Sequence, residues 1–410
     1  MRNEATEAVS ASLKRAEPKE SAWMAVISLT MGVFGLLTAE YLPASLLTPM
    51  AADLGVTEAL AGQAVTVTAV VALFAGLMVP RLTRNYDRRN VLLGFTVLMI
   101  ASNLLVALSS SLAVLLIMRI LLGIALGGFW SMAAAVAMRL VPAKSVPRAL
   151  SIIFSGIAVG TVVSIPLGSY LGGLYGWRSA FIAATAVGVL TLIFQLFTLP
   201  GMAPRRMTIT ASVMDLLRRP GIAMGMTGCV IAHTGQYALF TYIRPALENI
   251  AHLDVDRLSL ILLGFGIANF IGTLLAGWLM ERSLRLTLIL MPALVGFAAL
   301  SMILLPLEEK GLMLFVALWG MAFGGVPVAW SNWVARSVPD QAETAGGMVV
   351  AAVQSSIAAG AALGGSLFAI SGVTGVFITA GCIMFFATLV IGLKVRVALT
   401  SPTEQVATEG

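Results

Sequence analysis

Long apolar stretches recur along this chain, and each is long enough to form a helix that crosses a lipid bilayer. A spanning helix needs about 20 predominantly apolar residues. The stretches cover residues 22–46, 58–80, 91–109, 112–136, 150–173, 179–199, 221–243, 257–280, 286–305, 311–334, 345–371 and 373–393, with ends uncertain by several residues. The pattern therefore predicts an all-α membrane protein with 12 transmembrane helices.

Polar segments divide these helices into two sets of six. The predicted parts are an N-terminal tail (1–20), a first six-helix bundle (21–199), a linker (200–220), a second six-helix bundle (221–395) and a C-terminal tail (396–410). The first apolar run exceeds the roughly 7–15 residues of a signal-peptide core, so we expect helix 1 to be an uncleaved anchor. The linker carries four arginines and one aspartate and is interpreted as cytoplasmic, although a surface loop is equally compatible.

Composition supports a lipid environment. The chain of 410 residues is 59% hydrophobic and 11% charged, with a mean hydropathy of +0.96. Its polar surface is too small to cover a water-soluble globule of this size. Cys229 and Cys382 lie inside apolar runs without metal-ligand or redox spacing, so we interpret them as packing residues and expect neither a metal nor an organic cofactor.

The distribution of basic residues predicts the orientation. If the N-terminus is cytoplasmic, 20 of the 25 lysines and arginines lie in cytoplasmic segments. The opposite side holds Arg178, Arg244, Arg257 and Lys310, which leaves Arg119 inside a helix. The positive-inside rule then places both termini in the cytoplasm. Topology thus explains the net charge of +6, and no nucleic-acid role is needed.

An internal repeat relates the two halves. At an offset of 197 residues, Gly123, Gly127, Gly128, Arg139, Val141 and Pro142 recur as Gly320, Gly324, Gly325, Arg336, Val338 and Pro339. At an offset of 196, Gly168, Gly176, Phe181 and Ile182 recur as Gly364, Gly372, Phe377 and Ile378. Helices 4 to 6 therefore correspond to helices 10 to 12. Two parallel repeats around a central cavity are a plan typical of transporters that work by alternating access.

Two loops resemble the G-x-L-x-D-R-x-G-R-R loop of the major facilitator superfamily. The copy between helices 8 and 9 keeps Gly277, Glu281, Arg282 and Arg285. In the copy between helices 2 and 3, Arg88 and Arg89 match the basic pair. Pro80 stands there in place of the glycine and Arg84 in place of the acidic residue, so the usual role of this loop as a gate latch does not follow for the first copy.

Further segments resemble the same superfamily. Leu115-x-x-x-Arg119-x-x-x-Gly123 is similar to its arginine motif, and Ser164-Ile-Pro-Leu-Gly168 to a weakened form of the antiporter motif. The segments 40–49, 62–68 and 235–245 resemble the purine ribonucleoside efflux transporters of bacteria, a drug:proton antiporter type within the superfamily. The resemblance implies the major facilitator fold and proton-coupled export of nucleosides such as inosine and guanosine across the inner membrane, with the proton gradient as energy source.

Three ionisable residues lie within the predicted helices: Glu40, Arg119 and His233. A charge at the centre of a spanning helix costs about 2.5 to 3.5 kcal/mol on insertion scales, so each needs a reason. Glu40 and Arg119 reach a similar depth in the outer half. Our hypothesis is that Glu40 carries the proton, that Arg119 tunes it, and that His233 near the midplane is a second titrating group. The alternatives are a static ion pair, a glutamate that binds substrate, and a histidine used in packing.

A nucleoside pocket requires aromatic faces and a few hydrogen-bonding groups. Helix 7 offers His233, Gln236, Tyr237 and Phe240 on one face. The other candidate contacts are Tyr41, Gln63, Trp130, Asn269, Trp330, Asn332 and Gln354. Each of them is also compatible with interhelical packing, and either tryptophan with a position facing lipid or the core.

Other functions remain open at this level. An exporter of a sugar or a drug would share the fold and the Glu40–Arg119 arrangement, and would differ in the pocket. A membrane-embedded enzyme is disfavoured because the sequence has no H-E-x-x-H, G-x-S-x-G or phosphate-loop motif. A receptor is disfavoured because no soluble signalling domain is present. We expect a monomer in the bilayer with a small-molecule substrate.

Overall fold

The computed structural model describes residues 22–142, 145–204, 213–251, 253–338 and 341–395, and this part of the chain is helical without strands. The helices are α2 (Trp23–Ser45), α3 (Leu47–Leu54), α4 (Glu58–Ala61), α5 (Gln63–Leu82), α6 (Arg88–Ala107), α7 (Leu112–Leu140), α8 (Val146–Tyr175), α9 (Trp177–Thr198), α10 (Val213–Leu217), α11 (Ile222–Thr241), α12 (Ile243–Ala251), α13 (Val255–Leu304), α14 (Glu309–Ser337) and α15 (Ala342–Lys394). The predicted tails 1–20 and 396–410 lie outside the described residues, and α10 lies within the predicted linker.

Local signals start and divide these helices. Asp87 caps α6 by accepting from the backbone N–H of Arg89, and Asp254 caps α13 by accepting from that of Arg257. Gly176, with φ of 80°, separates α8 from α9, and Gly372, with φ of 61°, interrupts α15. L-residues with side chains rarely adopt this backbone region, which glycine enters freely.

Ten helices of the described chain are long and apolar enough to cross a membrane. This number is compatible with the 12 spans expected from the sequence, because α15 contains two of the expected spans and α11 has 20 residues of its own. The prediction of an all-α membrane protein is confirmed. Apolar side chains such as Phe197, 85% exposed, and Leu274, 62% exposed, cover the outside, where lipid replaces water as their solvent.

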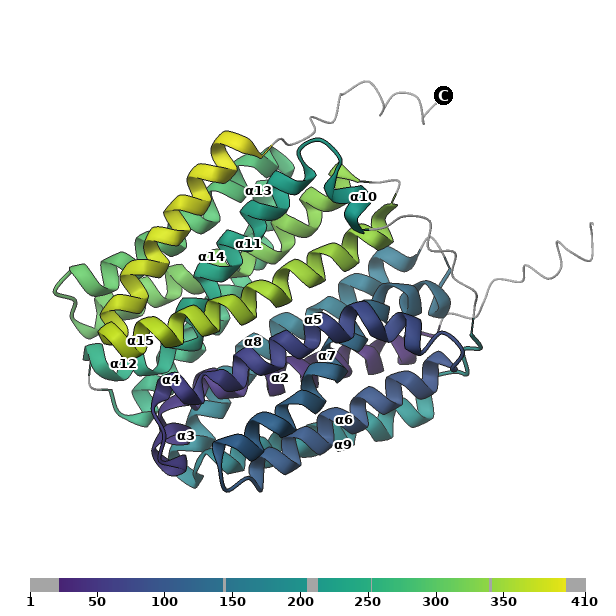
Figure 1. Cartoon of the computed structure of the whole chain (residues 1–410), viewed down its shortest axis with the longest axis horizontal. Helices are drawn as coiled ribbons and strands as arrows, with labels where there is room; N and C mark the ends of the chain where they lie inside the picture. Colours follow the sequence, from purple (N-terminus) through teal and green to yellow (C-terminus); the bar gives the residue numbers. More distant parts are fainter. Residues whose placement is uncertain (1–21, 143–144, 205–212, 252, 339–340, 396–410) are drawn as a thin grey trace, which may run out of the picture.

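The helices form two groups that lie side by side (Figure 1). In the first group, purple to blue, α2 packs on α8 and α9, and α7 packs on α5 and α6. In the second group, green to yellow, α13 packs on α14, and α11 packs on α15. Contacts of α5 with α15 and of α8 with α13 join the two groups.

The sequence repeat is reproduced in the helix contacts. A Cβ atom added at Gly127 of α7 would overlap the carbonyl oxygen of Ala72 in α5, and one added at Gly324 of α14 would overlap that of Asn269 in α13. Gly127 and Gly324 are 197 residues apart, as are Ala72 and Asn269. The same pair of backbones therefore meets in each half, and only glycine permits this separation.

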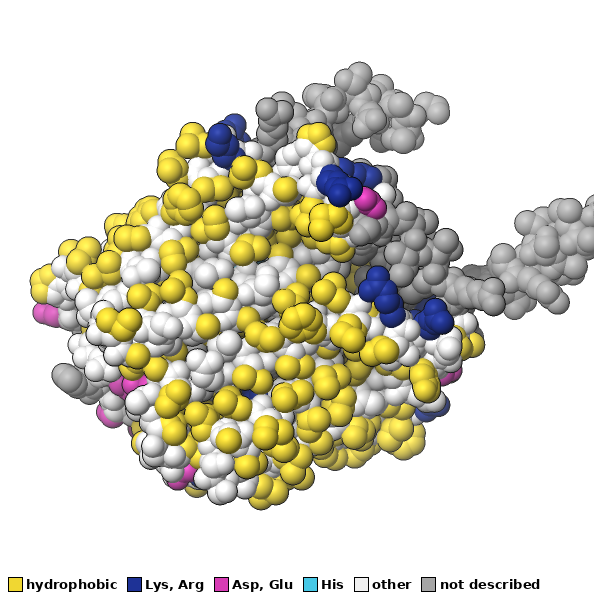
Figure 2. All heavy atoms as spheres, viewed as in Figure 1, with side chains coloured by type: hydrophobic (Ala, Val, Ile, Leu, Met, Phe, Trp, Pro, Cys, Tyr) yellow, Lys and Arg dark blue, Asp and Glu magenta, His cyan; other side chains and the backbone are white. Residues whose placement is uncertain are grey.

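Charged side chains lie at the two ends of the helices. On the face shown in Figure 2, apolar atoms cover the middle, Lys and Arg gather toward the upper right, and most Asp and Glu lie at the opposite end. At the end formed by α3, α4 and α12, the bundles contact each other directly. There Arg244 of the second bundle donates a hydrogen bond to the Ser45 carbonyl oxygen of the first, while within the second bundle the Tyr242 ring stacks on Phe368 with ring centroids 5.1 Å apart. This end of the molecule is closed.

Candidate functional site

Arg119 is a fully buried cation that joins three helices of the first bundle. From α7, its Nε donates to Thr68 Oγ1 of α5 over 2.9 Å, and its Nη1 donates to the Ala39 carbonyl oxygen of α2 over 2.8 Å. Its Nη2 has no hydrogen-bond partner among the described residues. Because a buried guanidinium needs acceptors, Arg119 fixes α7 against α2 and α5 at this depth.

Glu40 follows Ala39 directly and is also buried, with 8% of its surface exposed. Its Oε1 has no hydrogen-bond partner, and no ion pair joins it to Arg119 among the described residues. Glu40 of α2 and Arg119 of α7 thus lie next to the same residue, Ala39, without a direct bond to each other. The static ion pair considered from the sequence is absent from this conformation, and Glu40 keeps a free acceptor.

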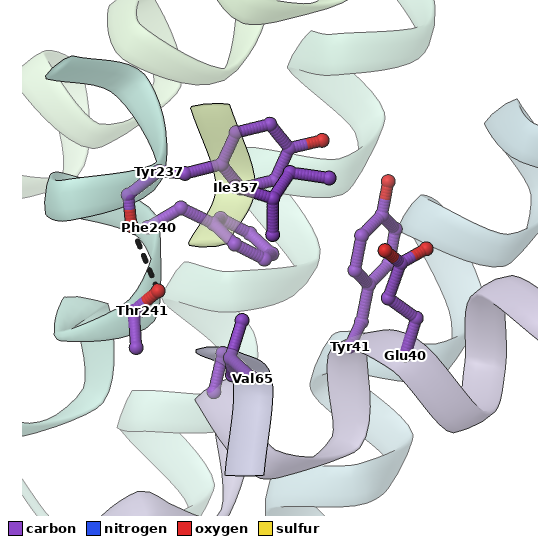
Figure 3. Close-up of a pocket in the computed structure, with 8 residues that line it drawn as sticks. Glu40, Tyr41, Val65, Tyr237, Phe240, Thr241 and Ile357 are labelled. Carbon is purple, nitrogen blue, oxygen red and sulfur yellow. Dashed lines mark hydrogen bonds between the residues drawn. The ribbon is translucent and has the colours of Figure 1, made fainter. Parts of the chain in front are cut away.

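A small cavity lies between the two bundles. It is lined by Glu40, Tyr41, Ala44, Val65, Tyr237, Phe240, Thr241 and Ile357 (Figure 3). The Tyr41 and Phe240 rings meet edge to face across the bundles, with centroids 5.2 Å apart. In Figure 3 the hydroxyls of Tyr41 and Tyr237 point toward each other. The cavity has room for about one water molecule, far less than an ordinary ligand pocket offers, so the bundles must move to admit a solute.

Aromatic rings extend from the cavity into the second bundle. Phe240 contacts Tyr237, Phe265 and Phe323 with centroid distances of 6.2, 6.0 and 5.9 Å. Phe265 in turn meets Trp319 at 5.3 Å. Such edge-to-face and tilted contacts pack these rings into a buried apolar cluster beside the cavity.

The face of α11 predicted to bind substrate carries two buried groups with unused hydrogen-bonding capacity. His233 Nδ1 lies 2.8 Å from the Cys229 carbonyl oxygen, which can only accept, so Nδ1 donates and Nε2 is the acceptor of the neutral ring. Gln236 Oε1 accepts from Trp319 Nε1 over 3.0 Å. Neither His233 Nε2 nor Gln236 Nε2 has a partner among the described residues.

Comparison with known proteins identifies the scaffold that holds this site. The family model described as Major Facilitator Superfamily matches residues 29–355 and, in a second match, 225–409. The chain belongs to this superfamily. Its members are transporters, so this protein is a multi-pass membrane transporter of the major facilitator fold.

Relatives and a solved structure agree with this assignment. The chain is 44% identical over 375 residues to proteins named purine ribonucleoside efflux pump NepI from Salmonella enteritidis PT4 and Salmonella typhimurium LT2, covering 92% of this chain and 94% of each relative. The crystal structure of a D-xylose-proton symporter matches with a TM-score of 0.74 and 17% identity, over 92% of this chain and 97% of the symporter. That likeness is one of fold.

The two loops that resemble the superfamily motif make equivalent hydrogen bonds. Arg89 Nη2 donates to the Leu196 carbonyl oxygen over 2.7 Å, and Arg285 Nη2 donates to that of Gly392 over 2.8 Å. Both partners are related by the same offset of 196 residues. The degraded first loop has therefore kept its link to the last helix of its bundle, although it lost the glycine and the acid of the motif.

The remaining motif residues are placed as follows. Arg88 is buried and donates through Nη1 to Thr83 Oγ1 over 2.9 Å. Arg282 lies 3.7 Å from the centre of the Trp278 ring. A Cβ at Gly277 would meet nothing within 4 Å, so helix packing does not explain the glycine. The side chain of Glu281 lies outside the described residues. A gating role for this set stays a prediction.

Several predicted contacts lie away from the cavity in this conformation. Trp130 packs on Phe129 and Phe154 within the first bundle, and Trp330 is buried against Trp333 in the second. Asn269 and Gln354 are buried, whereas Gln63 and Asn332 are half-buried. These six, like His233 and Gln236, do not line the cavity. Their substrate role stays a prediction that concerns a more open conformation.

Sequence reasoning missed Thr68 and Trp319, which hold Arg119 and Gln236. Thr68 lies within the segment 62–68 that resembles the nucleoside exporters, so a signal for it existed. Trp319 lies one residue before Gly320 of the internal repeat but has no distinct motif of its own. Its contact with Gln236 depends on how α14 and α11 are rotated against each other.

Proposed function

We propose that this transporter exports purine ribonucleosides, such as inosine and guanosine, across the inner membrane in exchange for protons. The observation that carries the proposal is the 44% identity, over 92% of the chain, to relatives named as purine ribonucleoside efflux pumps. The cavity supports it, because aromatic rings from both bundles meet beside a carboxyl group. A base stacks on such rings, and a ribose offers hydroxyls to the polar groups nearby.

Glu40 carries the proton in this scheme. Burial favours the neutral carboxyl, whereas the nearby positive charge of Arg119 favours the ionised one, so a small change of surroundings moves the proton on or off. When the cavity opens to the cytoplasm, Glu40 releases its proton there and the nucleoside binds. When it opens to the outside, the nucleoside leaves and Glu40 takes up a proton. Each cycle exchanges one solute for the proton held at Glu40.

Both termini lie in the cytoplasm in this proposal, and the protein acts as a monomer. The closed end formed by α3, α4 and α12 then faces outward. A substrate arriving from the cytoplasm enters from the opposite end.

Efflux from proteoliposomes tests this function. Vesicles loaded with labelled inosine are given an inward proton gradient or none, and we expect faster release with the gradient. Competition by unlabelled guanosine, a pentose and a cationic drug then separates a nucleoside exporter from an exporter of sugars or drugs. Gradient-driven release of the pentose or drug with none of inosine would refute the nucleoside assignment.

A further inference from the structure

The internal repeat extends to the helices that line the cavity. At the offset of 196 residues, Glu40 and Tyr41 of α2 recur as Gln236 and Tyr237 of α11. The two helices also end at corresponding residues, Ser45 and Thr241. The second bundle therefore carries, at the position of the acid, an amide of nearly the same shape.

The surroundings of this position differ between the bundles. The partners of the first bundle, Thr68 and Arg119, have Phe265 and Val316 as their counterparts at the offset of 197 residues, and both counterparts are buried. The hydrogen-bonded pair of Thr68 and Arg119 in the first bundle is thus replaced by two apolar side chains in the second. Gln236 has no proton to exchange at any physiological pH. We therefore look for the role of Gln236 in the binding of the solute.

Trp319 fixes the orientation of the Gln236 amide. An indole N–H can only donate, so the Trp319 Nε1 bond of 3.0 Å holds the carboxamide oxygen toward α14. The indole itself is held by edge-to-face contacts with Phe265 at 5.3 Å and Phe377 at 6.1 Å. With the oxygen occupied, the side chain presents only its NH₂ group, and this donor is buried without a partner. A buried N–H without an acceptor is costly, and a bound solute can supply that acceptor.

We infer that Gln236 Nε2 donates a hydrogen bond to an acceptor atom of the transported purine base, and that Trp319 positions the amide for it. This inference rests on the proposed function. A 6-oxopurine offers three such acceptors at its edge: the 6-oxo oxygen, N7 and N3. Tyr237 and Phe240, on the same helix and on the wall of the cavity, supply rings for the face of the base. Gln236 thereby determines specificity for solutes with an acceptor edge.

Gln236→Met tests the contact, because methionine keeps the length of the side chain and lacks a donor. Efflux from proteoliposomes is measured for inosine, for purine riboside, which lacks the 6-oxo group, and for 7-deaza- and 3-deazainosine. We expect the variant to raise the KM for inosine about tenfold with kcat little changed, which is the usual effect of one lost hydrogen bond. The analogue that lacks the contacted acceptor should show a similarly raised KM with the wild-type protein. For that analogue, Gln236→Met should raise the KM no further.

Two results for Gln236→Met overturn the inference. One is an unchanged KM for inosine, and the other is a KM raised by the same factor for inosine and for all three analogues. Trp319→Phe is the second variant, since it keeps the ring contacts and frees the amide to rotate. We expect Trp319→Phe to lower several-fold the ratio of the KM for the analogue that lacks the contacted acceptor to the KM for inosine, while kcat is retained. A ratio equal to that of the wild type would show that Trp319 does not position the amide. If the wild-type protein releases no inosine, the proposed function itself fails, whatever the variants do.

Discussion

Arg244 donates a hydrogen bond through Nη1 to the backbone carbonyl oxygen of Ser45 over 2.7 Å, and this bond joins the second bundle to the first. In a continuous helix the Ser45 carbonyl would accept from residue 49, but Pro49 has no N–H. α2 accordingly ends at Ser45, which leaves this carbonyl for Arg244. Glu248 holds the guanidinium in place through a 2.8 Å ion pair with its Nε.

Replacing Arg244 by Gln is therefore expected to loosen the closed end. Losing a charged donor to a buried carbonyl costs about 1.5–3 kcal/mol, which shifts the equilibrium toward the open form about tenfold or more. In a background without Cys229 and Cys382, a cysteine at the half-buried Ala59 of α4 is expected to react faster with a membrane-impermeant thiol reagent. Arg257→Gln, at an exposed ion pair, is the control. An unchanged labelling rate would show that Arg244 does not hold this end.

Glu40→Gln is expected to abolish the dependence of nucleoside efflux on the proton gradient, because an amide cannot carry the proton. Exchange of inosine across the membrane without a gradient should persist, since the variant keeps the size of the side chain. Glu309→Gln, which alters an exposed glutamate paired with Arg257, is the matched control and should retain gradient-driven efflux. Wild-type proton-driven flux in Glu40→Gln would remove Glu40 from this role.

Arg119→Lys is expected to destabilise the first bundle. An ammonium group cannot reach both Thr68 Oγ1 and the Ala39 carbonyl oxygen with the fixed geometry of the guanidinium, so one of these bonds is lost. We expect a loss of about 1–3 kcal/mol in the free energy of unfolding and an altered pH profile of efflux. Thr68→Val removes one of the same bonds and keeps the charge, so it should lower stability but leave the pH profile as it is. Thermal unfolding in detergent and efflux at several pH values check both.

Gly127→Ala and Gly324→Ala are each expected to cost about 1–3 kcal/mol in stability, because the added methyl overlaps a backbone carbonyl oxygen of the facing helix. Gly264→Ala on α13 is the control, since a Cβ there meets nothing within 4 Å and alanine favours the helix by about 0.5–1 kcal/mol. The thermal unfolding midpoint is the measurement. Similar midpoints for all three variants would contradict the close helix contacts.

Asp53 gives a pH dependence outside the membrane spans. The Arg178 guanidinium and the Trp177 indole N–H donate to its Oδ2 and hold the pKa of this carboxyl below its usual 3.8. Because the unfolded chain then binds more protons in acid, the stabilisation is present above about pH 4 and is lost as pH falls through the lowered value. The pair is about half exposed, so at most about 1 kcal/mol is at stake. Unfolding midpoints of wild type and Asp53→Asn should converge in acid; a constant difference would contradict this.

The sequence by itself determined the class of fold. Apolar length alone decides which segments enter a bilayer, and the repeated glycines fix which helices of the two halves correspond. Glu40 and Arg119 were also recognisable, because an ionisable residue within an apolar run is rare and needs a reason.

Only the tertiary structure decided which side chains contact each other. Hydropathy gives the depth of a residue in the bilayer but not the rotation of its helix about the helix axis. That rotation decides which side chains face each other and therefore which donors and acceptors come within hydrogen-bonding distance. Arg119 therefore meets Thr68 and Ala39 rather than Glu40, and the oxygen of the Gln236 amide is turned toward Trp319. The acceptor of the Arg244 hydrogen bond could not be predicted from the sequence either, because packing of the two bundles brings Ser45 and Arg244 together from distant parts of the chain.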